Sequence, residues 1–280
     1  MEFCTLASGS SGNAALLRCG KTTILLDAGI SARRITTAMK ALGMAPDDLT
    51  GIFITHEHSD HISGLATLAK QLQVPVYATA PTLHILCQKI PMLQGRCREI
   101  YPGRGVELEE VFVHSFPTSH DAACSVGYRV TGNDGCIVTL ATDLGYLSQG
   151  VKRAAQGCDL LVCETNHDED WVRTGPYPYH LKQRVLGDYG HLSNEVGAEL
   201  ATMAVESGTR TVLLAHLSSE NNTPARARQV TELRLSYSGI DAQRDITLAV
   251  APKKEIGAVY QLHHRGEVCQ FPTREQVAVC

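Results

Sequence analysis

The sequence predicts an α/β domain in which two β-sheets are covered by helices. Strand-like apolar runs outnumber helical ones, glycine turns separate many of these runs, and amphipathic helices occur only at intervals. This order favours two sheets with covering helices over one doubly wound parallel sheet. Because no linker divides the chain, we expect a single domain over residues 1–280.

The N-terminal part begins with strands. Residues 3–8, 13–19 and 22–29 are expected to be three strands that open a sheet, with glycine-containing turns between them. Residues 51–56 predict a further strand, and residues 61–72 carry apolar side chains at helical spacing. The strands expected next span residues 74–79, 110–117, 124–130, 135–143, 159–165 and 211–218.

Helices become more frequent towards the C-terminus. Residues 194–207 predict a helix that begins after Ser193, a residue that favours helix starts. A second helix is expected over residues 224–237. Residues 246–252 and 257–264 are expected to close the fold as a pair of strands.

Composition excludes several classes of protein. With 44% hydrophobic and 19% charged residues, the chain is neither collagen-like nor coiled-coil nor disordered. No apolar run approaches the ~20 residues of a membrane helix, and the first residues lack the pattern of a secretion signal. The ten cysteines contain no C-x-x-C pair and are expected to be reduced thiols. We therefore expect a cytoplasmic protein that does not bind membranes.

The net charge indicates how the protein could bind nucleic acid. The formal charge of −4 argues against a broad surface that coats nucleic acid, although it leaves room for a local basic groove.

The strongest chemical signal is the segment T-H-E-H-S-D-H over residues 55–61, which follows an apolar strand and precedes a helix. His56 and His58 point the same way in an extended segment, because alternate side chains share a face. Asp60 and His61 then present a carboxylate and an imidazole to a neighbouring point. The spacing therefore suits two adjacent cations rather than one.

This H-x-H-x-D-H pattern resembles the metallo-β-lactamase superfamily, and later motifs follow in that family's order over nearly the whole chain. They are L-L-D-A-G over residues 25–29, Ser119-His120, Ala141-Thr142-Asp143 and Ala215-His216. The resemblance implies a four-layered αβ/βα sandwich with a two-metal site at the sheet edges.

The resemblance also implies a set of ligands. One metal ion would be held by His56, His58 and His120, and the other by Asp60, His61 and His216. Asp143 would bridge the two. Imidazole and carboxylate ligands without thiolate suit Zn²⁺ or Mn²⁺, so we expect two divalent ions of one of these kinds.

Two further motifs indicate the branch of the superfamily. Glu164 follows an apolar strand, and His191 precedes the helix expected at 194–207. This pairing resembles the nuclease and phosphodiesterase branch, in which a glutamate orients a histidine aimed at the scissile phosphate. The motifs A-S-G-S-S-G-N, E-T-N-H-D, G-H-L-S-N and A-H-L-S-S-E-N-N-T-P resemble the bacterial YycJ/WalJ-type exonucleases more closely.

That resemblance implies a metal-dependent 5′→3′ DNA exonuclease with a role in DNA repair. The catalytic residues would be Asp60, His191 and Glu164, and the partner would be nucleic acid, DNA rather than RNA. Neither polarity nor oligomeric state follows from any residue of the chain.

Substrate contacts are expected at two places. Residues 168–190 form an insert that we place over the active site, where Lys182 and Arg184 would contact substrate. Ser10 and Asn13 lie in a glycine-rich turn whose backbone N–H groups suit a phosphate. An ordinary solvated loop and an ordinary β-turn remain the alternatives for these two segments.

Two other functions remain open. The same metals could hydrolyse a thioester or lactam, as in glyoxalase II-like enzymes, although the Glu164–His191 pair argues against this. A non-catalytic, metal-dependent DNA-repair accessory protein is the second alternative, and seven metal-binding side chains are difficult to explain in such a protein.

Overall fold

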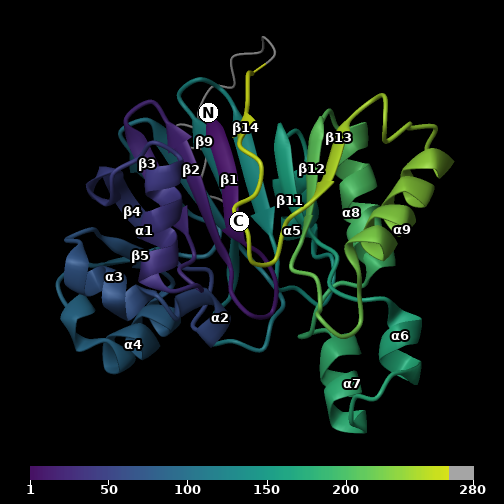
Figure 1. Ribbon diagram of the computed structural model, residues 1–280, viewed down its shortest axis with the longest axis horizontal. Coiled ribbons are helices and arrows are strands. Elements are labelled where there is room, and N and C mark those ends of the chain that lie inside the picture. Colours follow the sequence, from purple (N-terminus) through teal and green to yellow (C-terminus); the bar gives the residue numbers. More distant parts are fainter. Residues whose placement is uncertain (265–280) are drawn as a thin grey trace.

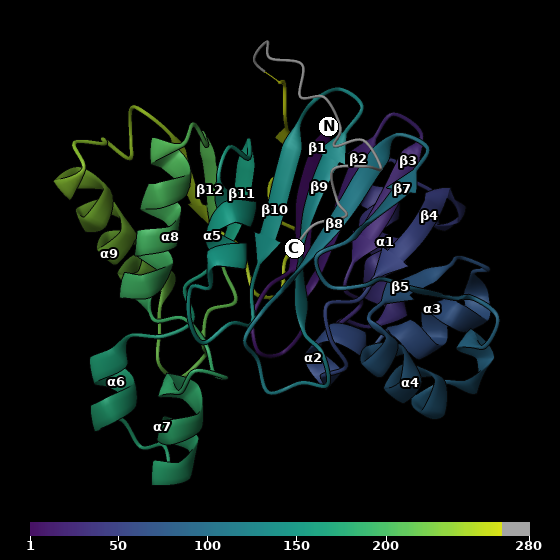
Figure 2. The ribbon, with the colours of Figure 1, turned by 180° about the vertical axis from the view of Figure 1, so that it is seen from behind.

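The structure is a computed structural model of the chain, and it describes residues 1–264. Within these residues two seven-stranded sheets pack against each other, and helices cover the outer face of each (Figure 1). The same layers are seen from behind in Figure 2. The predicted α/β class with two covered sheets is confirmed.

The first sheet has the strand order β14-β1-β2-β3-β4-β5-β6. Pairing is antiparallel from β14 to β3 and parallel from β3 to β6. Its strands are β14 (Tyr260–Gln261), β1 (Glu2–Ala7), β2 (Ala14–Cys19), β3 (Thr22–Leu26), β4 (Leu49–Phe53), β5 (Val76–Ala78) and β6 (Cys97–Glu99).

The second sheet has the order β13-β12-β11-β10-β9-β8-β7. Here β13 to β10 are parallel, and β10 to β7 are antiparallel. Its strands are β13 (Thr247–Val250), β12 (Thr211–Ala215), β11 (Leu160–Glu164), β10 (Ile137–Ala141), β9 (Val126–Gly132), β8 (Val111–Pro117) and β7 (Gly105–Leu108).

Helices follow the strands on both sides. Beside the first sheet lie α1 (Ala32–Ala41), α2 (Ser59–Ile62), α3 (Leu65–Gln71) and α4 (Ala80–Lys89), with short 3₁₀ turns at Pro46–Asp48 and Pro91–Leu93. Beside the second lie α5 (Gln149–Ala155), α8 (Asn194–Glu206) and α9 (Pro224–Tyr237). The remaining two, α6 (Glu169–Thr174) and α7 (Tyr179–Leu186), extend below the sheets in Figure 1. No helix within residues 1–264 is long and apolar enough to span a bilayer.

Alternating side chains build the core. In β3, Ile24 and Leu26 belong to the apolar cluster between the sheets, whereas Leu25 packs with the helices outside. Because successive strand residues face opposite ways, one strand serves two layers. Each fully buried leucine or isoleucine contributes roughly 1.5–3 kcal/mol, which holds the strand ends rigidly in place.

The helix expected over residues 61–72 is divided in two. It ends at Ile62 as α2 and resumes at Leu65 as α3. The break lies at Gly64, whose N–H donates to the Ala28 carbonyl, and where a Cβ would lie only 2.1 Å from the Ile30 carbonyl oxygen. The close approach of two backbones, which needs glycine, therefore interrupts the helix.

The expected closing pair of strands is wrong. β13 pairs with β12 in the second sheet, and β14 pairs with β1 in the first. Strands adjacent in sequence often pair, but here the intervening segment crosses from one sheet to the other. Each of the two strands therefore extends the edge of a different sheet.

Candidate metal centre

Strand ends from both sheets converge at one edge of the sandwich. β3 and β4 of the first sheet and β8, β10, β11 and β12 of the second end there. The polar residues at or just after these ends are Asp27, His56, His120, Asp143, Glu164 and His216. The edge is therefore where chemistry-bearing side chains meet.

Three of these residues have an uncommon backbone conformation. Asp27, Asp143 and His216 have φ values of 59°, 59° and 58°, in the left-handed region that favours glycine. Such conformations cost about 1–3 kcal/mol each and persist where surrounding structure enforces them. Hydrogen bonds do so here, because Asp27 N–H donates to the Phe53 carbonyl and His216 N–H to Ser8 Oγ. The left-handed conformation directs these three side chains into the site.

One group of imidazoles comes from two loops. Nε2 of His56 lies 3.1 Å from Nδ1 of His58, and Nε2 of His120 lies 3.3 Å from the same atom. The donor atoms of all three residues lie within 4.8 Å of one another. Three nitrogens this close can share one cation.

A second group lies beside the first. Donor atoms of Asp60, His61 and His216 also lie within 4.8 Å of one another. Asp143 stands between the groups, with Oδ2 3.4 Å from Nε2 of His61 and Oδ1 3.7 Å from Nε2 of His120. The structure thus brings together all seven residues of the expected ligand set, with Asp143 in the central position.

The donor set fits cations. Asp143 Oδ2 and His216 Nε2 are buried and have no hydrogen-bond partner within residues 1–264, although buried polar atoms are normally paired. Burial alone would lower the pKa of His216, but Asp143, Asp60 and Glu164 raise it to about 10. Buried carboxylates thus favour protonated imidazoles, and a bound divalent ion would take the place of the proton.

Carboxylates outside the donor set orient the imidazoles. Asp27 Oδ2 accepts from Nδ1 of His61 at 2.8 Å, and Oδ1 of the same residue accepts from Thr55 N–H. Partners of this kind fix the ring and the tautomer of a metal-binding histidine.

Glu164 is completely buried and connects two histidines. Its Oε1 accepts from Nδ1 of His191 at 2.9 Å and from Nδ1 of His216 at 2.7 Å, and its Oε2 accepts from the backbone of Leu144 and Leu192. His191 stands outside the seven-donor set, with a side chain 20% exposed. The pair therefore presents one oriented imidazole at the rim of the centre.

A family model described as "Beta-lactamase superfamily domain" matches residues 22–217, which include all seven donors. The chain belongs to the metallo-β-lactamase superfamily. The similarity extends to "Exodeoxyribonuclease WalJ" of Streptococcus pneumoniae serotype 2 (strain D39), at 38% identity over 85% of this chain and 90% of that protein. "Exodeoxyribonuclease YycJ" of Bacillus anthracis is 35% identical over the same shares.

A solved structure supports the fold of this metallo-β-lactamase superfamily member. The metallo-beta-lactamase fold protein YhfI from Bacillus subtilis has a TM-score of 0.67 at 17% identity, with 92% of this chain and 98% of that chain covered. The four-layered sandwich implied by the sequence motifs is therefore confirmed.

Two of the four expected substrate residues contact the candidate metal centre or its neighbours, and two do not. Asn13 Nδ2 lies 3.1 Å from Nε2 of His61, and Arg184 Nε donates at 2.6 Å to Asp121, the neighbour of His120. Both therefore border the centre. Lys182 instead donates from Nζ to the Arg173 carbonyl within the insert, and Ser10 lies exposed on its turn.

Sequence reasoning missed Glu57, which lies between two histidines of the superfamily's first motif. Its Oε1 accepts from Ala123 N–H at 2.8 Å, and its Oε2 accepts from Thr82 Oγ1 at 3.3 Å. Glu57 thereby fastens the His120 loop and α4 to the segment that carries His56. The sequence could have indicated this role. In an extended segment, a residue between two histidines that share a face points to the opposite face, where it can contact neighbouring loops.

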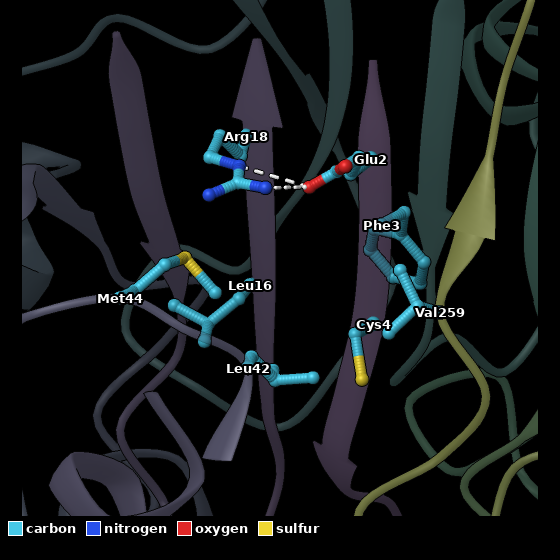
Figure 3. A pocket seen from close by; sticks show the side chains of 8 residues that line it. All are labelled: Glu2, Phe3, Cys4, Leu16, Arg18, Leu42, Met44 and Val259. Carbon is cyan, nitrogen blue, oxygen red and sulfur yellow. Dashed lines mark hydrogen bonds and ion pairs between the residues drawn. The ribbon is translucent and has the colours of Figure 1, made fainter. Parts of the chain in front are cut away.

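A hollow far from this edge has no room for a substrate. It lies against β1 and β2, beside the ion pair of Arg18 and Glu2, and is lined by Leu16, Leu42 and Val259 among others (Figure 3). Its volume of about 30 Å³ accommodates roughly one water molecule. This hollow is therefore not a substrate site.

Proposed function

We propose that this protein is a binuclear metal-dependent 5′→3′ exonuclease that hydrolyses phosphodiester bonds in DNA. The observation that carries the proposal is the buried Glu164 carboxylate holding His191 beside a seven-donor metal centre. The names of the two similar proteins, both exodeoxyribonucleases, support DNA as substrate.

The proposed metal ions are Zn²⁺ or Mn²⁺, which imidazole and carboxylate donors both suit. We assign His56, His58 and His120 to one ion and Asp60, His61 and His216 to the other, with Asp143 shared. When bound, two such ions neutralise charge on the phosphate and make a water molecule acidic enough to attack at neutral pH.

Side chains of the protein then accept and donate the protons that the reaction transfers. Asp60, which is partly exposed and borders both His61 and His216, accepts a proton from the attacking water. As the bond between phosphorus and the sugar oxygen breaks, His191 donates its proton to that oxygen, which would otherwise leave as an unstable alkoxide. Glu164 keeps the His191 ring oriented through the hydrogen bond to Nδ1.

We propose that the insert of residues 168–190 forms a wall over this centre. Arg184, anchored by Asp121, and Lys182 would contact backbone phosphates, and Ser10 and Asn13 would border the scissile group. The contacts of Asn13 with Asp60 and of Arg184 with Asp121 support these two most directly.

The proposed setting is DNA repair in the cytoplasm. The eight cysteines within residues 1–264 are free thiols, as is usual in a reducing compartment.

Digestion of end-labelled oligonucleotides tests the function. With Mn²⁺ or Zn²⁺ added, we expect stepwise shortening of DNA from the 5′ end and slower or no cleavage of the matched RNA. Hydrolysis of S-lactoylglutathione without cleavage of DNA would instead support the thioester alternative. Inactivity on both substrates in a protein shown by elemental analysis to hold two metal ions would support the accessory role.

A further inference from the structure

Two surface loops meet beside the metal centre. One follows Asp143 and the other closes the insert, and they touch so closely that a Cβ on Gly145 would lie 2.3 Å from the Asp188 carbonyl oxygen. Both are tied to the His120 loop. Gly145 N–H donates to the Ser119 carbonyl at 2.9 Å, and the Gly190 carbonyl accepts from Nδ1 of His120 at 3.2 Å. The loops therefore have a fixed position at the rim.

Each loop carries an exposed tyrosine next to these anchors. Tyr146 follows Gly145 and is 49% exposed, and Tyr189 precedes Gly190 and is 67% exposed. Neither phenol hydroxyl makes a hydrogen bond within residues 1–264. Two rings that neither pack in the core nor use their polar ends are left free at the entrance to the site.

The neighbouring charge suits a polyanion. α7, which leads into the Tyr189 loop, carries Lys182 and Arg184 and has no acidic residue of its own, and Arg184 is paired with Asp121 of the His120 loop. None of its side chains is buried, so the helix stands clear of the core. Basic residues that follow a phosphate backbone, combined with exposed aromatic rings, are the usual means of binding a nucleic-acid strand through its bases.

We infer that Tyr146 and Tyr189 stack against the bases at the end of the strand being cut and so hold its first phosphodiester over the metal centre. This inference rests on the proposed nuclease function and names how that site holds its substrate. Stacking does not depend on which base is present, because every base has a π face. An enzyme that removes successive nucleotides needs such tolerance.

The test compares ring removal with base removal. Tyr146→Ala and Tyr189→Ala are each assayed on a DNA oligonucleotide with ordinary terminal bases and on one whose first two nucleotides are abasic. We expect each alanine variant to raise KM on the ordinary end about 5- to 150-fold, the usual effect of losing one base–aromatic stack. On the abasic end the variants should match the unaltered protein, which should itself bind this end more weakly.

Two controls separate stacking from other effects. Tyr146→Phe and Tyr189→Phe keep the ring and should stay within about twofold of the unaltered protein, because the hydroxyl plays no part. Tyr237→Ala removes a 74% exposed tyrosine from α9, away from the centre, and should change neither substrate's KM. Phenylalanine variants that resemble the alanine ones, or equal losses on both ends, would overturn the inference.

Binding measured without cleavage separates this inference from the proposed function. Fluorescence anisotropy of the metal-loaded protein reports affinity for the same two oligonucleotides, each made with a nonhydrolysable first linkage. Ring-dependent binding in a protein that never cuts DNA would refute the nuclease and keep the stacking role. Cleavage with ring-independent binding would refute the stacking role alone, and a protein that neither binds nor cuts DNA would refute both.

Discussion

The Oε1 atom of Glu164 accepts a hydrogen bond from Nδ1 of His191 at 2.9 Å, inside a region closed to solvent. Burial would raise the pKa of this carboxyl, but the His191 and His216 imidazoles hold it well below its ordinary value. Glu164 therefore remains ionised and orients the His191 ring. The contact places an oriented imidazole beside the candidate metal centre.

Replacement of His191 should separate chemistry from metal binding. For His191→Ala we expect metal content and fold to persist while the rate on DNA falls about 10²- to 10⁴-fold, the usual contribution of general acid–base catalysis. The loss should be smaller on bis(p-nitrophenyl) phosphate, because p-nitrophenolate leaves without a proton. Steady-state rates and elemental analysis measure both. Equal losses on the two substrates would indicate phosphate stabilisation instead, and loss of metal would make His191 a ligand.

Glu164→Gln should affect metal binding as well as the orientation of His191. Because Oε1 also accepts from His216, the neutral amide weakens the support of one candidate metal ligand. We expect a 10- to 100-fold weaker metal affinity at the second site, together with a lower rate, as is typical for a partner of a metal-binding histidine. Metal titration against a competing chelator measures the affinity. Unchanged metal affinity would show that Glu164 acts only by orienting His191.

Asp143 is the candidate whose loss should be most damaging. Its two oxygens lie near His61 of one donor group and His120 of the other, so Asp143→Ala removes a shared negative charge. We expect loss of one metal ion and at least a hundredfold lower rate, on the scale of losing a dominant electrostatic contribution. Elemental analysis and turnover of the same preparation check this. Two retained ions with near-normal turnover would show that the shared position belongs to another residue.

Glu57 should act on the first metal group only. Glu57→Ala releases the Ala123 N–H and Thr82 hydroxyl that join the His120 loop to the first motif. We expect metal affinity of the His56, His58 and His120 group to fall about 10- to 100-fold. Glu57→Gln, which keeps an oxygen for Ala123, should recover most of it. A Co²⁺ titration followed by absorption distinguishes the sites, and loss at the other group would contradict the assignment.

The metal-free protein should lose stability in alkaline solution. The pKa of His216 is raised to about 10 by neighbouring carboxylates, whereas an unfolded histidine titrates near 6.5. The stabilisation is therefore complete below about pH 6.5 and is lost as pH rises towards 10. Bound metal replaces this proton, so loaded protein should lack the effect. Thermal unfolding of chelator-treated and loaded protein over this range measures it, and a constant Tm without metal would contradict it.

Much of the fold followed from local patterns. Apolar runs such as 22–29 and 135–143 predicted strands because burial on both faces leaves a continuous hydrophobic signature, which β3 and β10 confirm. Helix α1 was missed although Ile35, Ala38 and Met39 bury one face of it. The short helices α6 and α7 bury one residue or none, so they leave no periodic signal in the sequence.

The sequence by itself determined which side chains could form the site. The H-x-H-x-D-H segment and the later strand-end motifs named all seven candidate donors through their resemblance to the metallo-β-lactamase superfamily. Tertiary structure alone decided what lies between them. The additional contact of Glu164 with His216, the hydrogen bonds made by Glu57 and the meeting of the Tyr146 and Tyr189 loops join segments far apart in the chain. Local sequence patterns carry no record of such contacts, because they depend on how two sheets pack and on where each loop is then forced to turn.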